Sequence, residues 1–182
     1  MTRSCFLYSA LVTGFLLLGT SAVSLAGEAA PAVVKSIINE PLQKVGSGAY
    51  TKFGFTIYHA TLWAPNGKWD AEKPYALEIC YARSLSQATM ADSTIDSIRD
   101  ENTADEATLA RWSEDIKRTM PAVKNGDVMI GATSPDSQTV LYFNDHEISK
   151  TKDPAFTRAF FNIWLGEKAD EDLKKELLAE AE

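Results

Sequence analysis

Apolar residues recur at helical spacing between Asp153 and Gly166, near the carboxyl-terminal end of the chain. Asp153 can cap the first turn, the proline that follows it suits the first helical position, and Gly166 can end the helix. At about 100° per residue, one apolar stripe is formed by Phe156, Ala159, Phe160, Ile163 and Trp164, and Phe161 and Leu165 widen it. An ordinary surface helix has a narrower stripe. The pattern therefore predicts either a helix buried deep in the core, or one that lies between a sheet and a second contact, which is another helix, a ligand or a partner.

Two segments of the chain alternate with the period of a β-strand, residues 53–65 and residues 75–83. In the first segment, the odd-numbered side chains from Phe53 to Trp63 would face one way and the even-numbered side chains the other. Both faces carry large apolar groups, so we expect both to be covered. Three shorter strands are predicted over residues 127–133, 139–144 and 147–149, with turn signals at 66–67, 134–137 and 144–145.

Helical spacing also predicts two helices in the middle of the chain and one at its end. Ser84-x-x-Gln87 and Thr103-x-x-Glu106 each match a capping box. Apolar stripes follow the two boxes, the first at Ala88, Ala91, Ile95 and Ile98, the second at Leu109, Trp112, Ile116 and Met120, where Pro121 stops the helix. A charged amphipathic helix is predicted over residues 170–181. Since the strands can pair by hairpins, with helices between and after them, the pattern predicts an α+β domain with an antiparallel sheet.

The first 26 residues have the pattern of a secretory signal peptide and are excluded from the fold. Arg3 is the one charged residue before an apolar run, and Ser24-Leu25-Ala26 matches the small-x-small cleavage pattern. An uncleaved N-terminal anchor is the alternative, although the run is short for a membrane span. We expect a mature chain that begins at Gly27 and is periplasmic or secreted, with no stable transmembrane segment. A flexible arm is predicted over residues 27–40, and a single domain over residues 41–182.

The charge balance of the chain is acidic, with 18 Lys and Arg against 25 Asp and Glu and a formal net charge of −7. Without a basic run, this balance argues against nucleic acid and against anionic membrane surfaces as partners. His59 and His146 have no second ligand at a metal-binding spacing, so neither a metal site nor a cofactor is predicted. Gly46-Ser47-Gly48 precedes a predicted strand rather than a helix, and is therefore not interpreted as a phosphate-binding loop.

Polar aromatic and cationic residues gather at two predicted strands. Tyr50 and Lys52 enter the first strand, Tyr58 lies further along it, and Tyr81 and Arg83 end the second. Phenols and cations beside aromatic strand faces can hold a planar ligand that bears a carboxylate or carbonyl, and they can polarise a carbonyl during chemistry. The alternative is that these side chains form the polar rim of the sheet, with their apolar stems lying along it.

The same residues lie in a series of blocks that resembles a known family. The run from Gly46 to Pro65 is similar to the glycine-x-glycine…GF-x-VY-x-A-x-LW opening of bacterial chalcone isomerase-like proteins. Further similar blocks follow in the family order at 75–83, 93–98, Trp112, Met120-Pro121, 124–127, 142–144 and 153–166. The resemblance covers nearly all of the predicted mature chain.

The resemblance implies the chalcone isomerase-like fold, in which a curved antiparallel sheet is backed by a layer of helices with a cleft between them. Plant members of the family close a flavanone ring by intramolecular addition, whereas other members lack this catalysis and some bind fatty acids. The plant enzymes use an arginine early in the sheet. Here Tyr50 and Lys52 stand where that arginine is expected. This departure argues against isomerase activity, and no catalytic residue is assigned.

Two main interpretations of function remain, with a weaker third. The first is an exported, non-catalytic protein whose cleft between sheet and helices binds an apolar or amphiphilic small molecule, fatty-acid-like or flavonoid-like. The ligand-binding candidates are Tyr50, Lys52, Tyr58, Tyr81, Arg83, Phe161 and Trp164. The second is an intramolecular lyase of the chalcone isomerase type that acts on an enone. The weaker third is a protein-interaction module, with an unidentified protein partner, that uses an exposed part of the aromatic helix.

Overall fold

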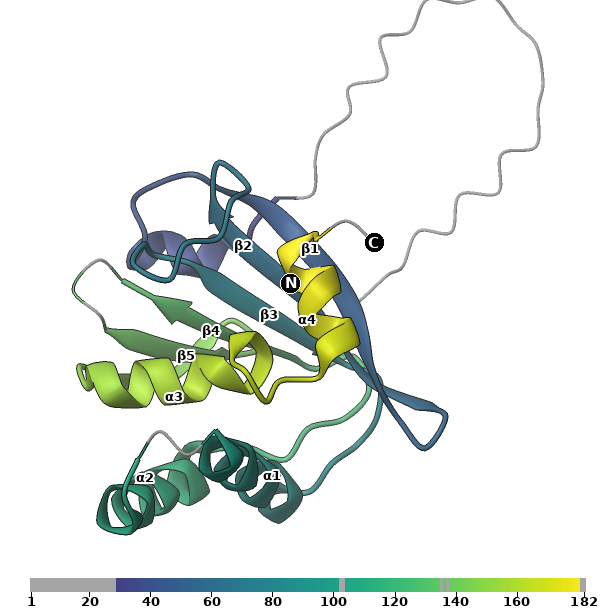
Figure 1. Ribbon diagram of the computed structural model, residues 1–182, viewed down its shortest axis with the longest axis vertical. Helices are drawn as coiled ribbons and strands as arrows, with labels where there is room; N and C mark the ends of the chain where they lie inside the picture. Colours follow the sequence, from purple (N-terminus) through teal and green to yellow (C-terminus); the bar gives the residue numbers. More distant parts are fainter. Residues whose placement is uncertain (1–28, 102–103, 135, 137, 181–182) are drawn as a thin grey trace, which may run out of the picture.

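Six strands form one antiparallel sheet in the computed structural model, which describes residues 29–101, 104–134, 136 and 138–180. The strands are β1 (Leu42–Lys52), β2 (Phe55–Pro65), β3 (Ala76–Tyr81), β4 (Val128–Thr133), β5 (Thr139–Phe143) and β6 (His146–Thr151). Each strand pairs with the next one in the sequence, so the sheet order is β1-β2-β3-β4-β5-β6. The sheet curves along β1 and β2 (Figure 1). The predicted α+β fold with an antiparallel sheet is confirmed.

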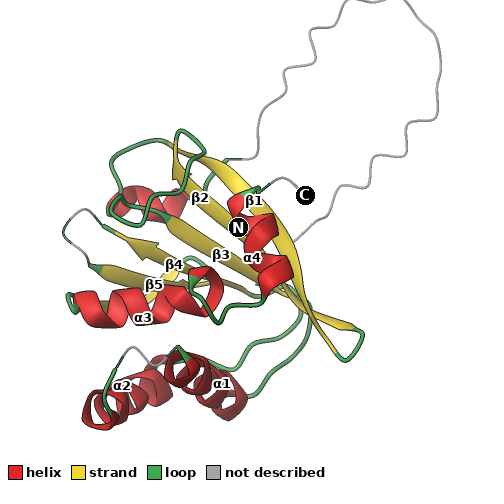
Figure 2. Ribbon diagram, in the orientation of Figure 1, coloured by secondary structure: helices red, strands yellow, loops and turns green. Residues whose placement is uncertain are grey.

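Four α-helices cover one face of the sheet (Figure 2). They are α1 (Gln87–Asp100), α2 (Glu106–Thr119), α3 (Pro154–Leu165) and α4 (Glu171–Leu178). The opposite face carries a smaller apolar cluster that includes Trp63 and Ile130. A 3-10 helix, η1 (Ala32–Ser36), supplies Val34 to this cluster, and Ile38 follows it there. We expected a flexible arm over residues 27–40. The structure differs over the part of that segment that it describes, residues 29–40, because these two buried side chains pack against the sheet.

The aromatic helix α3 lies between the sheet and the outer helices. Phe161 meets the ring of Tyr75 edge-on at 4.9 Å on the sheet side. Phe156 meets Trp112 of α2 at 5.6 Å on the other side. The predicted double contact of this helix is confirmed. Its aromatic side chains are all buried and Ile163 is half-buried, so α3 offers no exposed aromatic face for a protein partner.

Our prediction of the extent of the first strand was wrong. We predicted one strand from Phe53, whereas Phe53 and Gly54 form the turn of a hairpin between β1 and β2. Gly46 and Gly48 therefore lie inside a strand rather than before one. A Cβ at Gly46 would overlap the carbonyl oxygen of Glu176 in α4, so the missing side chain lets this helix pack directly on β1.

Three local details of the helices also differ from the prediction. The N-cap of α1 is Ser86 rather than Ser84, and that of α2 is Asp105, while Thr103 lies outside the described residues. In α1, Met90 is buried although it was not in the predicted apolar stripe, and Ala88 is exposed although it was. The last helix ends at Leu178, before the predicted end at residue 181, which is also not described. Capping by Asp153 and the stop of α2 before Pro121 are confirmed. The predicted signal peptide lies outside the described residues.

Candidate functional site

A cavity of about 600 Å³ lies between the first three strands, α1 and the segment that joins α3 to α4. Its volume is within the range of small-molecule sites in proteins, roughly 300–1,000 Å³. The lining residues that are buried are all apolar or aromatic, namely Tyr81, Met90, Trp164 and Leu173. The exposed ones are polar, namely Lys52, Thr89, Ser93, Asp96, Asp100, Lys168 and Asp170. The cavity thus has an apolar floor and a polar rim, the type of cavity that an amphiphile fills.

Strand register brings three of the predicted tyrosines together on the cavity wall. Tyr50 of β1 is the register partner of Tyr58 of β2, and Tyr58 is in turn the partner of Tyr81 of β3. The rings of Tyr50 and Tyr58 stack at 5.1 Å, and Tyr81 meets Tyr58 edge-on at 6.1 Å. These contacts form a continuous aromatic row across the sheet, with a rigid apolar surface toward the cavity.

A hydrogen bond joins this row to helix α3. Trp164 Nε1 donates to Tyr58 Oη at 3.0 Å. Burial raises the pKa of Tyr58 well above its ordinary value, although the bond from Trp164 opposes this shift. Burial raises the pKa of Tyr81 as well. Both phenols are therefore protonated at neutral pH. Because Tyr58 Oη accepts from Trp164, its own hydrogen is left to donate to a carbonyl or carboxyl oxygen in the cavity.

Five of the seven predicted site residues line this one cavity, namely Tyr50, Lys52, Tyr58, Tyr81 and Trp164. The two others do not. The guanidinium carbon of Arg83 lies 4.3 Å from the centre of the Phe55 ring, so this side chain packs against the hairpin rather than in the cavity. Phe161 is 1% exposed and fills the space beside Gly131 and Tyr75. Its place in the core follows from the absent side chain of Gly131, which lets its ring approach the sheet.

The rim of the cavity carries charges of both signs. Lys52 and Lys168 are its cations, and its carboxylates are Asp96, Asp100, Glu101 and Asp170. Three of the carboxylates have partners within the fold. Asp96 pairs with Arg99 at 2.9 Å, Glu101 accepts the backbone N–H of Lys168 at 2.9 Å, and Asp170 caps α4. A ligand carboxylate would therefore be attracted most strongly near the two lysines.

Comparison with known proteins identifies the family. The sequence profile described as chalcone isomerase-like matches residues 22–179. The chain belongs to the chalcone isomerase-like family. Among solved structures it is similar to the crystal structure of an Arabidopsis thaliana fatty-acid binding protein, with a TM-score of 0.59 and 10% identity over 75% of this chain and 86% of that chain. At that identity the likeness supports the predicted fold. No curated protein sequence matches the chain.

Three residues that line the cavity were not predicted as site residues from the sequence. Met90, Ile163 and Leu173 line the cavity from three different segments. Each lies in a helix whose apolar spacing also suits an ordinary core position, so no local signal separates them. No arginine is found among the described residues that line this chalcone isomerase-like cavity.

Within the described ranges, no three His, Cys, Asp or Glu side chains are grouped so that they could hold a metal ion. No helix of this part of the chain is long and apolar enough to cross a membrane.

Proposed function

We propose that this chain is an exported, non-catalytic member of the bacterial chalcone isomerase-like proteins that carries an apolar or amphiphilic small molecule, of fatty-acid or flavonoid type. The observation that carries the proposal is the 600 Å³ cavity with buried Met90, Trp164 and Leu173 at its floor and polar groups at its rim. The similar Arabidopsis structure is named as a fatty-acid binding protein, which favours the same ligand class here.

The cavity suits such a ligand in two ways. Its apolar floor stabilises a hydrocarbon or an aromatic ring by about 25 cal/mol for each Å² of apolar surface removed from water. The aromatic row then supplies a rigid wall, and the protonated Tyr58 supplies a donor for an uncharged or charged oxygen. Lys52 at the rim supplies the charge partner for a carboxylate.

Thermal shift against a panel of fatty acids and flavonoids tests the proposal directly. A ligand at a hundred times its dissociation constant stabilises the fold by about 2.7 kcal/mol. We expect Lys52→Met to weaken binding of a fatty acid more than binding of its methyl ester, because only the acid loses a charge partner. Lys44→Met, in the same strand but outside the cavity, is the matched control and should leave both affinities unchanged. If no member of the panel raises the melting temperature, the proposal is wrong.

The ligand itself can be identified from protein purified in its native host. Extraction with organic solvent followed by mass spectrometry should release an amphiphile in amounts that approach one per chain.

Export is the second part of the proposal, and it is supported by the apolar run and the Ser24-Leu25-Ala26 pattern. Intact-mass measurement on protein from the cell envelope should give a chain that begins at Gly27. A chain that retains residues 1–26 would contradict cleavage, and recovery only from the cytosol would contradict export.

A further inference from the structure

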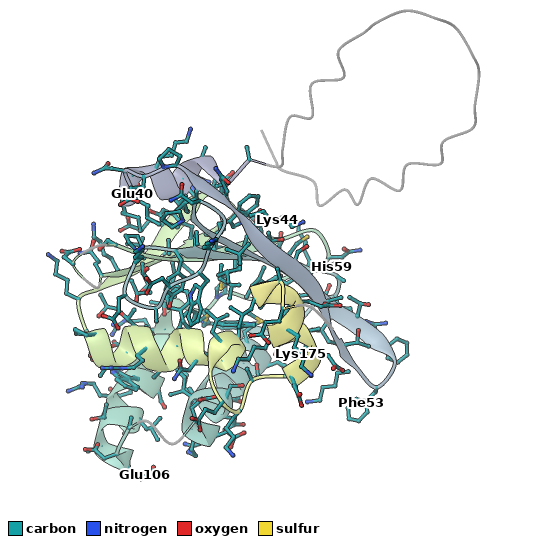
Figure 3. The ribbon with its side chains drawn as sticks, turned by 45° about the horizontal axis from the view of Figure 1, so that its top comes forward. Glu40, Lys44, Phe53, His59, Glu106 and Lys175 are labelled. Atoms are coloured by element: carbon teal, nitrogen blue, oxygen red, sulfur yellow. The ribbon has the colours of Figure 1, made fainter. Side chains whose placement is uncertain are left out.

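The hairpin between β1 and β2 ends in two exposed phenylalanines. Phe53 is 89% exposed and Phe55 is 55% exposed, and they are the exposed large hydrophobic residues of the described chain. Phe53 marks the tip of the hairpin, which projects from the body of the molecule (Figure 3). Apolar side chains at such a position contribute nothing to the core, so the fold alone does not explain them.

The backbone at the tip makes this choice of residue costly. Phe53 and Gly54 have φ values of +53° and +77°, the two left-handed residues of a tight hairpin turn. Asn and Gly tolerate this conformation, whereas a bulky residue is strained in it. The two other turns with such residues follow the rule, with Asn66-Gly67 at +57° and +66° and Asn144-Asp145 at +48° and +68°. Only the exposed tip places phenylalanine there, which points to a role outside the fold.

Two cations, Lys52 and Arg83, lie beside the phenylalanines of the tip, although the net charge of the chain is −7. Lys52 Nζ lies 5.8 Å from the centre of the Phe53 ring, and Arg83 lies 4.3 Å from that of Phe55. The acidic average argued against anionic membranes as partners, but the hairpin is a local exception to it.

We propose that the hairpin tip docks the protein on the surface of a lipid bilayer, with Phe53 and Phe55 inserted among the lipids and Lys52 and Arg83 at the headgroups. Aromatic residues flanked by cations suit the interface of a bilayer that contains anionic lipid. A two-residue tip is too small to bury the roughly 800 Å² per partner of a stable protein interface. A bilayer needs no such area, because each inserted side chain partitions on its own.

Docking at this point would bring the cavity to the membrane. Tyr50, Lys52 and Ile57 belong to the same hairpin and also line the cavity wall. A docked tip therefore holds the cavity beside the lipid from which an amphiphile can be taken, or to which it can be delivered. This link to ligand exchange rests on the proposed function, whereas docking itself does not.

A matched pair of tryptophan variants tests the insertion. Phe53→Trp and Asn66→Trp place the same reporter at the first position of two turns with similar backbone angles. Vesicles are made from brominated phosphatidylcholine and phosphatidylglycerol in equal parts, since bromine quenches tryptophan only within the bilayer. We expect strong additional quenching for Phe53→Trp and none for Asn66→Trp. Equal quenching in the two variants, or none at position 53, overturns the proposal. Any membrane affinity of residues 1–26 is common to both proteins.

Phe53→Asn supplies a second, independent measurement. Asparagine is favoured at this turn position, so the variant should be at least as stable as the wild type in thermal unfolding. Vesicle flotation should show partitioning weakened on the order of tenfold, the effect expected when one phenylalanine no longer inserts. Unchanged partitioning overturns the proposal, and so does a loss of self-association in place of a loss of vesicle binding. Ligand binding in the absence of vesicles should be unaffected, so failure of docking and failure of the proposed function are distinguished.

Discussion

Tyr58 is the residue on which sheet, helix and cavity meet. Its ring stacks on Tyr50 and meets Tyr81 edge-on, and its oxygen accepts the indole N–H of Trp164. Trp164 is 9% exposed, so an unpaired indole N–H at this position would be costly. Tyr58 therefore fixes the position of α3 relative to β2 while it also presents a donor to the cavity.

Tyr58→Phe is expected to lower the free energy of unfolding by about 1–3 kcal/mol, because Trp164 Nε1 loses its acceptor. The effect should fall near the lower limit if a cavity water replaces the phenol. Tyr50→Phe is the matched control, since this change removes the same group from the stacked neighbour, for which the described residues supply no hydrogen bond. Urea unfolding of both variants without ligand measures the difference. Equal destabilisation by the two changes would show that the hydrogen bond is not the cause.

The sequence predicted some of the site residues correctly and others incorrectly. Tyr58 and Tyr81 were found because they lie on predicted strands among aromatic neighbours, and Tyr50 because it lies just before the first of these strands; strand register then brought the three together. The same argument predicted that Arg83 lies in the cleft, and this prediction was wrong. It follows the end of β3, where the direction of its side chain depends on the nearby hairpin and on Phe55. No pattern within the chain determines such a contact.

Elements with strong local signals were predicted well, and those without them were not. The helix α3 has a capping aspartate, a proline at its first position and a continuous apolar stripe, and all three act locally. Strand β1 has two glycines, Gly46 and Gly48, which are poor strand formers and are explained only by the approach of α4. Its turn was missed for a related reason, because phenylalanine stands where Asn or Gly is the usual signal.

The N-terminus of α3 provides a pH-dependent element. Burial alone would raise the pKa of Asp153, but hydrogen bonds from Trp112 Nε1 and from the amides of Phe156 and Ala155 outweigh it and lower that pKa below its ordinary value. A carboxyl group with a depressed pKa stabilises the fold above its unfolded pKa of about 3.9. That stability is lost as the pH falls through the folded pKa.

Asp153→Asn keeps an acceptor for the cap but removes the charge, and is expected to cost about 1 kcal/mol at neutral pH. The difference from the wild type should shrink as the pH falls from about 4 through the lower folded-state pKa, below which the wild-type carboxyl group is also neutral. Asp92→Asn, on an exposed position of α1, controls for the change in net charge. Urea unfolding as a function of pH measures both variants. A difference that stays constant down to strongly acidic pH would contradict the role assigned to the charge.

At the scale of the whole molecule, the fold and the chemistry are separable. The chain has the chalcone isomerase-like fold, and its cavity lies between the sheet and the helices, as the family resemblance implied. Fold does not determine activity, which depends on the groups that line the cavity. Here the cavity is lined by Tyr50 and Lys52 in the region where the plant enzymes are expected to use arginine. A lysine provides a point charge, whereas the planar guanidinium group holds an oxyanion with two parallel donors.

The chain should therefore lack appreciable chalcone isomerase activity. Ring closure moves the negative charge of the substrate from its phenolate oxygen, which forms the new C–O bond, to its carbonyl oxygen, and the loss of one donor to such a developing charge typically costs on the order of 10²–10³ in rate. Absorbance of a hydroxychalcone follows the reaction, with a plant chalcone isomerase as the positive control. We expect a rate close to that in buffer, even under conditions where a flavonoid raises the melting temperature. A turnover number in the usual enzymatic range, about 1–10³ per second, would contradict this prediction. If Tyr58→Phe then abolished that turnover, the activity would belong to the cavity, and the protonated phenol would replace the arginine as its oxyanion donor.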